Sequence, residues 1–253
     1  MSYYAKRLLL HNQIIINMPN QTEQVIEAMR QNGGYATFGQ LNHIIDFSAW
    51  KTKTPQATVR RIVQESNAFF KIQPGLWALR EFENEVLNKF QLKTKDKKQT
   101  ELFTHSYYQG LVVEIGNMKK FQTCIPPQDK NKLFLEKPLK DLANLHEIYN
   151  FTYPEILRKA MTVDVIWFNE RKLPHSFFEI EHSTDIQNSL TKFFELQDYF
   201  ARFFIVADES RRKQFDDIMK KSIFTPIKNR VVFADYENIV NQYTNMSKIR
   251  YII

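Results

Sequence analysis

The chain has 253 residues, of which 43% are hydrophobic, as is typical of one large or two ordinary globular domains. No apolar run is long enough for a transmembrane helix, and the first residues lack the apolar core of a secretory signal, so we expect a cytoplasmic protein. A single cysteine, Cys124, excludes an internal disulfide framework and a cysteine-based zinc cluster. We expect it to be a buried apolar residue.

Positive charge is concentrated toward the N-terminus. The chain carries 35 Lys and Arg against 28 Asp and Glu, and five of the seven excess positive charges fall in the first 80 residues. This imbalance favours a polyanionic partner such as double-stranded DNA, through contacts to phosphate. Solubility alone is the alternative explanation.

The sequence pattern of residues 1–81 predicts a small domain of three helices and two strands. Helices are expected in TEQVIEAMRQNGG, TFGQLNHIIDF and KTKTPQATVRRIVQESNAFF, the third with Thr54 as its N-cap and Pro55 at its first position. The segment FFKIQPGLWAL predicts two short strands around Pro74-Gly75. Three helices and a β-wing are typical of a winged helix-turn-helix, whose third helix can enter the major groove of DNA.

The polar residues at and near the third helix suit contact with DNA. No acidic residue occurs between Lys51 and Gln64. We therefore expect DNA contacts from Lys51, Lys53, Thr54, Gln56, Thr58, Arg60 and Arg61. A solvated helix face and a protein-interaction module are the alternatives.

Three stretches of this region resemble the HARE-HTH family of winged helices, namely GYATFGQLNHII, TPQATVRRIV and FFKIQPGLWAL. The resemblance covers about residues 20–80. Members of that family are found fused to restriction endonucleases, and the resemblance implies such a fusion here.

Residues 82–104 are charged and interrupt the apolar pattern, so we expect a linker there. From 105 to 253, helical and strand patterns alternate. Strands that are nearly continuous in apolar residues indicate an α/β domain with a mixed central sheet, buried on both faces. The expected fold class of the chain is therefore α+β, in two domains.

Three acidic residues interrupt the apolar strands of the second domain. Glu179 and Glu181 are two positions apart, so a strand directs both to one face, while Phe178 and Ile180 face a core. Asp164 is the only charge in TVDVIWF, and the short connection NERKLPH lets its strand pair with that of the glutamates. Converging carboxylates repel one another unless cations balance them, and Mg²⁺ accepts oxygen ligands. The pattern predicts a metal site made by all three acids, with structural acids paired to Arg or Lys as the alternative.

The spacing of these acids resembles the PD-(D/E)xK nuclease superfamily, in which one acid is followed on the next strand by Glu-x-Lys. Asp164 matches the first acid and Glu179 the second, while Glu181 stands where the lysine usually stands and Val163 replaces the proline. Some restriction enzymes of the superfamily use Glu-x-Glu and remain active. The resemblance covers about residues 104–240 and implies a Mg²⁺-dependent nuclease. Together with the N-terminal region, the chain is similar to a restriction endonuclease of the HARE-fused kind.

Three further residues are candidates for the same site. Lys192, in the helix DIQNSLTKFFELQDYF, either extends toward the acids in place of the missing lysine, as in some members of the superfamily, or covers apolar surface with its ammonium in water. Glu114 lies in helical register with inward residues, either as a salt-bridged core residue or as a further metal or water contact. Lys130, in the loop PPQDKNK, is either solvated or a phosphate contact.

These patterns predict a Mg²⁺-dependent Type II restriction endonuclease that cleaves double-stranded DNA at a specific sequence. Palindromic cleavage of both strands needs two active sites, so we expect a homodimer, with a companion DNA methyltransferase encoded nearby. The alternatives are a DNA-binding regulator with an inactive nuclease-like domain, and a repair nuclease or junction resolvase.

Overall fold

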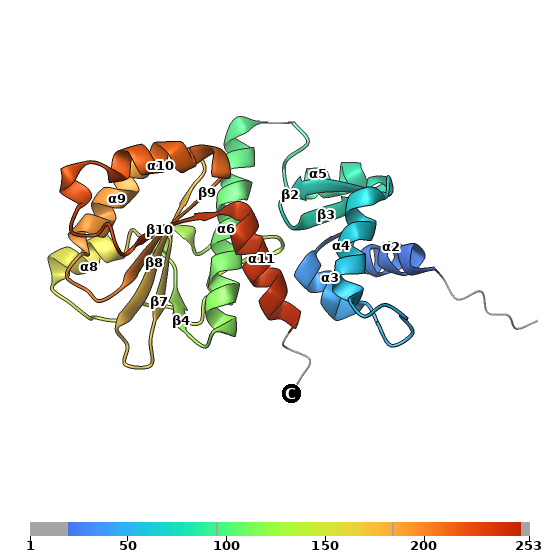
Figure 1. Ribbon diagram of the computed structural model, residues 1–253, viewed down its shortest axis with the longest axis horizontal. Coiled ribbons are helices and arrows are strands. Elements are labelled where there is room, and N and C mark those ends of the chain that lie inside the picture. Colours follow the sequence, from blue (N-terminus) through green and yellow to red (C-terminus); the bar gives the residue numbers. More distant parts are fainter. Residues whose placement is uncertain (1–19, 95, 184, 249–253) are drawn as a thin grey trace, which may run out of the picture.

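Helix α6 (Lys97–Met118) lies against a five-stranded sheet at the centre of the molecule in the computed structural model (Figure 1). The structure describes residues 20–94, 96–183 and 185–248. The N-terminal stretch that we expect not to be a secretory signal lies outside the described residues. No helix within the described ranges is both long and apolar enough to cross a membrane.

The sheet has the strand order β10-β9-β8-β7-β4. β9 pairs in parallel with β8 and with β10, whereas β7 pairs antiparallel with β8 and with β4. The fold is therefore α+β with a mixed sheet, as predicted, while the division into two domains with an N-terminal winged helix stays a prediction. The strands are β4 (Gln122–Cys124), β7 (Val165–Phe168), β8 (Pro174–Glu181), β9 (Arg202–Ala207) and β10 (Val231–Asp235).

Helices cover both faces of this sheet (Figure 1). α6 and α11 (Tyr236–Ser247) pack on the face that carries Phe178 and Ile180, while α9 (Ile186–Glu195) and α10 (Arg212–Met219) lie over the other face. Alternation along β8 therefore directs its two glutamates toward α9. The connections contain η2 (Pro127–Asp129), β5 (Leu133–Phe134), β6 (Lys137–Pro138), α7 (Leu139–Leu142), α8 (Pro154–Ala160), η3 (Glu209–Arg211) and η4 (Ser222–Phe224).

The N-terminal part contains three helices and a small antiparallel sheet of order β1-β3-β2. A capping box between Asn20 and Glu23 starts its first helix, and Gly33 and Gly34, with φ of 85° and 86°, end it in a conformation that favours glycine. Thr54 precedes the third helix, as predicted, but makes no side-chain capping bond. The elements are α2 (Gln21–Gln31), β1 (Tyr35–Thr37), α3 (Phe38–Ile44), α4 (Pro55–Glu65), β2 (Phe69–Gln73) and β3 (Leu76–Leu79). The short η1 (Arg80–Phe82) and α5 (Glu83–Lys89) follow them.

Residues 82–104 do not form the expected linker throughout. They contain α5, and α6 already begins at Lys97. Val86 and Phe90 are buried in the same apolar cluster as Tyr107 of α6. A few apolar anchors are enough to order a stretch whose overall charge is typical of a solvated linker.

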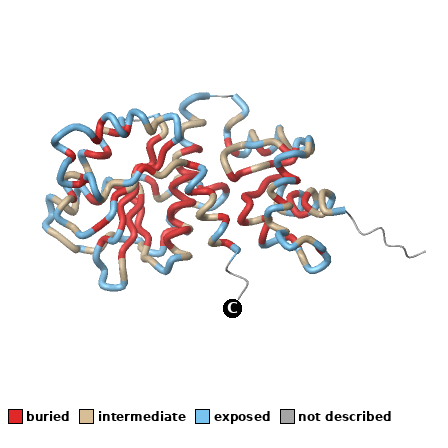
Figure 2. Tube along the Cα trace, in the orientation of Figure 1, coloured by how far each residue is buried: buried red, intermediate tan, exposed pale blue. Residues whose placement is uncertain are grey.

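The N-terminal part and the sheet domain share one core. Buried residues of β3, α5, α6 and α11 belong to a single apolar cluster, and Figure 2 shows the buried segments of α6 and α11 between the two parts. Gly75, with φ of 78°, lies so close to α11 that an added Cβ would be 2.4 Å from a methyl carbon of Val240. Arg60 of α4 donates to Asn241 Oδ1 at 2.9 Å. α11 also packs on α6 of the sheet domain and on α3 of the N-terminal part, so it contacts both.

Candidate active site

The three predicted acids come from adjoining strands. Asp164 lies directly before β7, and Glu179 and Glu181 lie at the end of β8. The two glutamate residues are only 2% and 4% exposed. Asp164 Oδ2 accepts a hydrogen bond from the backbone N–H of Ile180 at 2.7 Å, which fixes this acid against the neighbouring strand. The paired strands thus bring the three acids to one region.

Lys192 of α9 lies against one of these acids. Its ammonium donates to Glu179 Oε1 at 3.0 Å, to Oε2 at 2.9 Å and to the carbonyl of Thr162 at 3.1 Å. Burial raises the pKa of Glu179 well above its usual range, and the Asp164 charge adds to this rise while Lys192 opposes it. Burial acts to lower the pKa of Lys192, but Glu179 outweighs burial and the pKa is raised. The Lys192 side chain therefore extends toward the acids and stays charged there.

A buried hydroxyl connects the two glutamates. Ser189 Oγ lies 3.1 Å from Glu179 Oε2 and donates to Glu181 Oε1. The other carboxylate oxygen of Glu181 lies 3.9 Å from Nη1 of Arg211. Glu181 is thus held between a hydroxyl and a guanidinium group.

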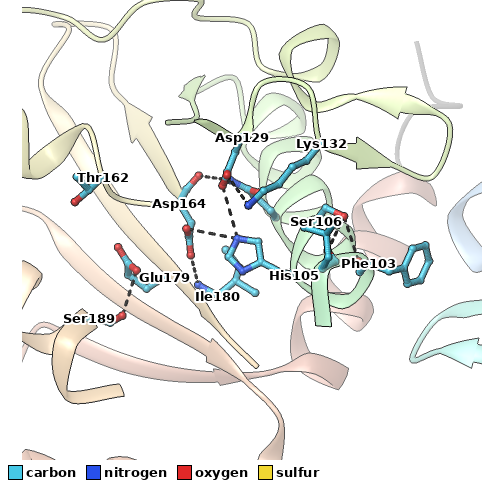
Figure 3. Close-up of polar contacts among 12 residues, drawn as sticks. Phe103, His105, Ser106, Asp129, Lys132, Thr162, Asp164, Glu179, Ile180 and Ser189 are labelled. Atoms are coloured by element: carbon cyan, nitrogen blue, oxygen red, sulfur yellow. Dashed lines mark hydrogen bonds and ion pairs between the residues drawn. The ribbon is translucent and has the colours of Figure 1, made fainter. Parts of the chain in front are cut away.

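A second group of side chains lies on the other side of Asp164 (Figure 3). His105 Nε2 lies 3.5 Å from Asp164 Oδ1 and 3.7 Å from Asp129 Oδ2. Lys132 Nζ lies 2.5 Å from Asp129 Oδ1, and Gln109 Nε2 donates to Asp129 Oδ2 at 2.9 Å. Burial acts to lower the pKa of His105, but the two aspartates outweigh burial and raise it to about 10. Burial acts to raise the pKa of Asp129, but its polar neighbours, His105 first, lower it to about 2.

Two predicted residues lie away from the acids. Glu114 is nine residues along α6 from His105, which is two and a half turns and therefore the opposite side of the helix. It lines a cavity of about 310 Å³ together with Tyr35 and other residues of the N-terminal part. The structure does not bring it to the acids. Lys130 follows η2 and lines a different cavity, beside Cys124.

The residues predicted to contact DNA lie before and along α4. Arg60 is half-buried: besides its hydrogen bond to Asn241, its guanidinium carbon lies 5.0 Å from the centre of the Phe38 ring. The Arg61 side chain is 61% exposed and pairs with Glu65 at 3.0 Å. Two adjacent arginines thus differ in whether they face the sheet domain or solvent. Of the others, Lys51, Lys53 and Thr54 are exposed, and Gln56 and Thr58 are half-buried.

Comparison with known proteins shows which family the chain belongs to. The family described as the Type II restriction enzyme NmeDI C-terminal domain matches residues 86–253. The chain belongs to this family. The Type II restriction enzyme NmeDI of Neisseria meningitidis serogroup C is 30% identical over 124 residues, which are 45% of this chain and 35% of that enzyme, so the match spans about a third of its relative. No solved structure matches the chain.

The match to the NmeDI C-terminal domain family begins within α5 and includes the acids, Lys192 and His105. Helices α2 to α4 lie outside it. The prediction of a restriction-enzyme relative is confirmed, while the resemblances to PD-(D/E)xK nucleases and to HARE-HTH winged helices stay predictions.

Five site residues of this NmeDI-like segment are absent from the sequence-based prediction, namely His105, Gln109, Asp129, Ser189 and Arg211. His105 and Gln109 are four positions apart on α6, a spacing that places both on one helix face. Ser189 lies three positions before Lys192 on α9 and shares its face in the same way. These two helical spacings are sequence patterns from which His105, Gln109 and Ser189 could have been predicted as site residues. Asp129 lies in a short connection without periodicity, and nothing in the sequence pattern singles it out.

Proposed function

We propose that this protein is a Mg²⁺-dependent Type II restriction endonuclease that hydrolyses phosphodiester bonds of double-stranded DNA at a specific sequence. Its active site is of the PD-(D/E)xK type and consists of Asp164, Glu179, Glu181 and Lys192. The observation that carries the proposal is the contact between the Lys192 ammonium and both oxygens of the buried Glu179 carboxylate. That cation supplies from α9 the positive charge that Glu-x-Glu lacks, in a chain that belongs to a restriction-enzyme family.

The donor set fits a hard divalent cation. The three acids offer carboxylate oxygens, the ligands that Mg²⁺ prefers. Glu179 and Glu181 are buried so deeply that their charges require compensation by cations. Asp164 and Glu179 would hold the ion, with Glu181 beside them. When bound, Mg²⁺ supplies a Lewis acid and lowers the pKa of a water molecule.

The protein residues around the acids orient the reacting groups. The Lys192 ammonium balances the carboxylates and orients a water molecule or a phosphate oxygen. The N–H of Ile180 fixes Asp164, and the hydroxyl of Ser189 fixes the glutamates. Supporting hydrogen bonds of this kind hold metal-binding carboxylates in one orientation.

The N-terminal part, as a winged helix, would recognise the DNA. Its exposed Lys51, Lys53, Thr54 and Arg61 are available to phosphates and base edges at the start and outer side of α4. Lys130 would add a phosphate contact from the sheet domain. Cleavage of both strands of a palindrome would need a homodimer, and protection of the host would need a companion methyltransferase.

Digestion of plasmid DNA tests the proposal. Unmethylated plasmid, and plasmid methylated by the companion methyltransferase, would be incubated with the full chain in Mg²⁺ or in EDTA. Discrete fragments from unmethylated DNA in Mg²⁺ alone are the expected result. Their absence from the Glu179→Gln variant would show that the chain itself makes the cuts. Identical patterns in Mg²⁺ and EDTA, or no cutting of any plasmid that carries the site, would overturn the proposal.

A further inference from the structure

His105, Asp129 and Asp164 converge from three separate elements, namely α6, η2 and the residue before β7. One potential ligand atom from each lies within 4.8 Å of the other two. Two ligands at about 2.1 Å from a common ion are about 3.0–3.4 Å apart when they subtend an angle between 90° and the tetrahedral value. The observed separations from His105 Nε2 are 3.5 and 3.7 Å. A contraction of a few tenths of an ångström would therefore bring the His105 nitrogen and each aspartate oxygen to the separation of two ligands on one ion.

Hydrogen bonds from neighbouring groups orient the aspartate carboxylates around His105. Asp164 Oδ2 is taken by the Ile180 N–H, so Oδ1 faces His105. Gln109 Nε2 donates hydrogen bonds to Asp129 Oδ2 at 2.9 Å and to the Asp164 carbonyl at 2.8 Å, which holds the two aspartates against α6. Within the described part of the chain, the buried Nε2 of His105 makes no hydrogen bond of good geometry. Outer contacts of this kind orient metal ligands.

The charge of the buried Asp129 carboxylate also favours a cation at this position. The Asp129 side chain is 3% exposed and needs a nearby cation, a place that Lys132 fills at 2.5 Å. The Lys132 side chain is 30% exposed, so its ammonium can move to solvent when another cation binds. Lys132 therefore competes with any ion at this position.

We propose that His105, Asp129 and Asp164 form a second divalent-cation position, which prefers a transition ion such as Mn²⁺ or Co²⁺ to Mg²⁺. An imidazole nitrogen suits transition ions, whereas Mg²⁺ selects oxygen, and the ion would displace the proton of His105 to solvent on binding. The inference rests on the proposed function because Asp164 serves both positions. Glu179 belongs only to the first position and His105 only to the second, so the two can be tested separately.

Isothermal titration of the full chain without DNA tests the second position. Wild-type protein should bind two Mn²⁺ but one Mg²⁺. His105→Ala should weaken one Mn²⁺ equivalent at least about 10-fold, because loss of a ligand costs no less than loss of an outer-shell partner, and leave Mg²⁺ binding unchanged. Asp129→Asn should behave in the same way. His175→Ala, which removes an exposed histidine at the far end of β8, is the matched control and should change nothing.

Lys132→Met provides a variant with the opposite expectation. Removing the competing ammonium should tighten Mn²⁺ binding at least about fivefold, the effect of one unit charge at about 4 Å in water. This substitution of a half-buried side chain gives a readout that does not depend on the His105 and Asp129 variants, and circular dichroism checks the folding of all three. One Mn²⁺ per wild-type chain, or no tightening in Lys132→Met, would overturn the inference and leave the cluster as an ion-pair network.

Glu179→Gln separates this inference from the proposed function. It should abolish Mg²⁺ binding while keeping the His105-dependent Mn²⁺ equivalent. Unchanged Mg²⁺ binding in Glu179→Gln would count against the proposed active site, whereas two full Mn²⁺ equivalents in His105→Ala would count against the second position.

Discussion

The Lys192 ammonium lies 3.0 and 2.9 Å from the two carboxylate oxygens of Glu179, so a cation from α9 meets an acid from β8 inside the molecule. The Lys192 side chain is 31% exposed and that of Glu179 is 3% exposed. The lysine is thus the more exposed member of the pair.

Lys192→Ala should reduce the cleavage rate at least ~100-fold, the scale typical of removing one electrostatic stabiliser. DNA affinity measured in Ca²⁺ should change little, because the lysine acts on the reacting groups. Single-turnover digestion measures the rate. Lys220→Ala removes an exposed lysine that pairs only with Asp217 among the described residues, and serves as the control. Full activity in Lys192→Ala would leave Glu181, acting with a second metal, as the better account.

Replacement of Asp164, Glu179 or Glu181 by Ala should reduce Mg²⁺-dependent cleavage at least ~100-fold, because the metal supplies several kcal/mol of charge stabilisation. DNA binding in Ca²⁺ should remain measurable. The isosteric variants Asp164→Asn and Glu179→Gln control for packing. Wild-type cutting by Glu179→Ala would sink the assignment.

Arg61 and Arg60 form a matched pair of adjacent residues on α4. Arg61→Ala should weaken DNA binding and make the slope of log affinity against log salt shallower by about 1, the effect of one lost phosphate contact. Fluorescence anisotropy over a range of salt concentrations measures both quantities. An unchanged slope would indicate that this face of α4 does not meet phosphate.

Arg60→Ala should instead lower the free energy of unfolding by about 1–2 kcal/mol, through loss of the Asn241 hydrogen bond and the contact with the Phe38 ring. Arg61→Ala should stay within about 0.5 kcal/mol of wild type. Urea denaturation distinguishes them. Equal stabilities of the two variants would contradict the packing role of Arg60.

Cys124 should react slowly with thiol reagents in the native protein. Burial raises its pKa to about 11, so about 0.1% of the thiol is ionised at pH 8, against about a quarter for an ordinary cysteine. The rate should rise at least ~100-fold in denaturing urea and, in the folded state, as the pH approaches 11. A native rate equal to the denatured one would contradict the buried position.

The sequence predicts strands well where apolar residues alternate with the acids. The period of two in β8 correctly separates Phe178 and Ile180 from Glu179 and Glu181, because the sheet is covered on both faces by different helices. The pairing of β7 with β8 follows from the short connection between them. The partners of the acids are harder to predict from the sequence, because Asp129 and His105 contact Asp164 only through the tertiary fold.

Glu114 shows where a one-face interpretation of a helix fails. Nearly every residue of α6 from Phe103 to Gly116 is buried, because the sheet covers one side of the helix, while α11 and β5 cover others. An inward register therefore does not say which neighbour a residue faces. Glu114 faces the N-terminal part, whereas His105 faces the acids.

The position of α11 restricts how the N-terminal part of this protein can be exchanged. Gly75 touches Val240, Gly39 leaves room for Tyr243, and Arg60 reaches Asn241, so three elements of the N-terminal part are fitted to one helix from the other end of the chain. A chimera made by joining the first 81 residues of a relative to this chain would present α11 with foreign neighbours. The N-terminal part is therefore not a self-contained unit in sequence. Under the proposed role of α4 in DNA recognition, point substitutions at the start and exposed side of α4 should disturb the fold less than an exchange of the first 81 residues.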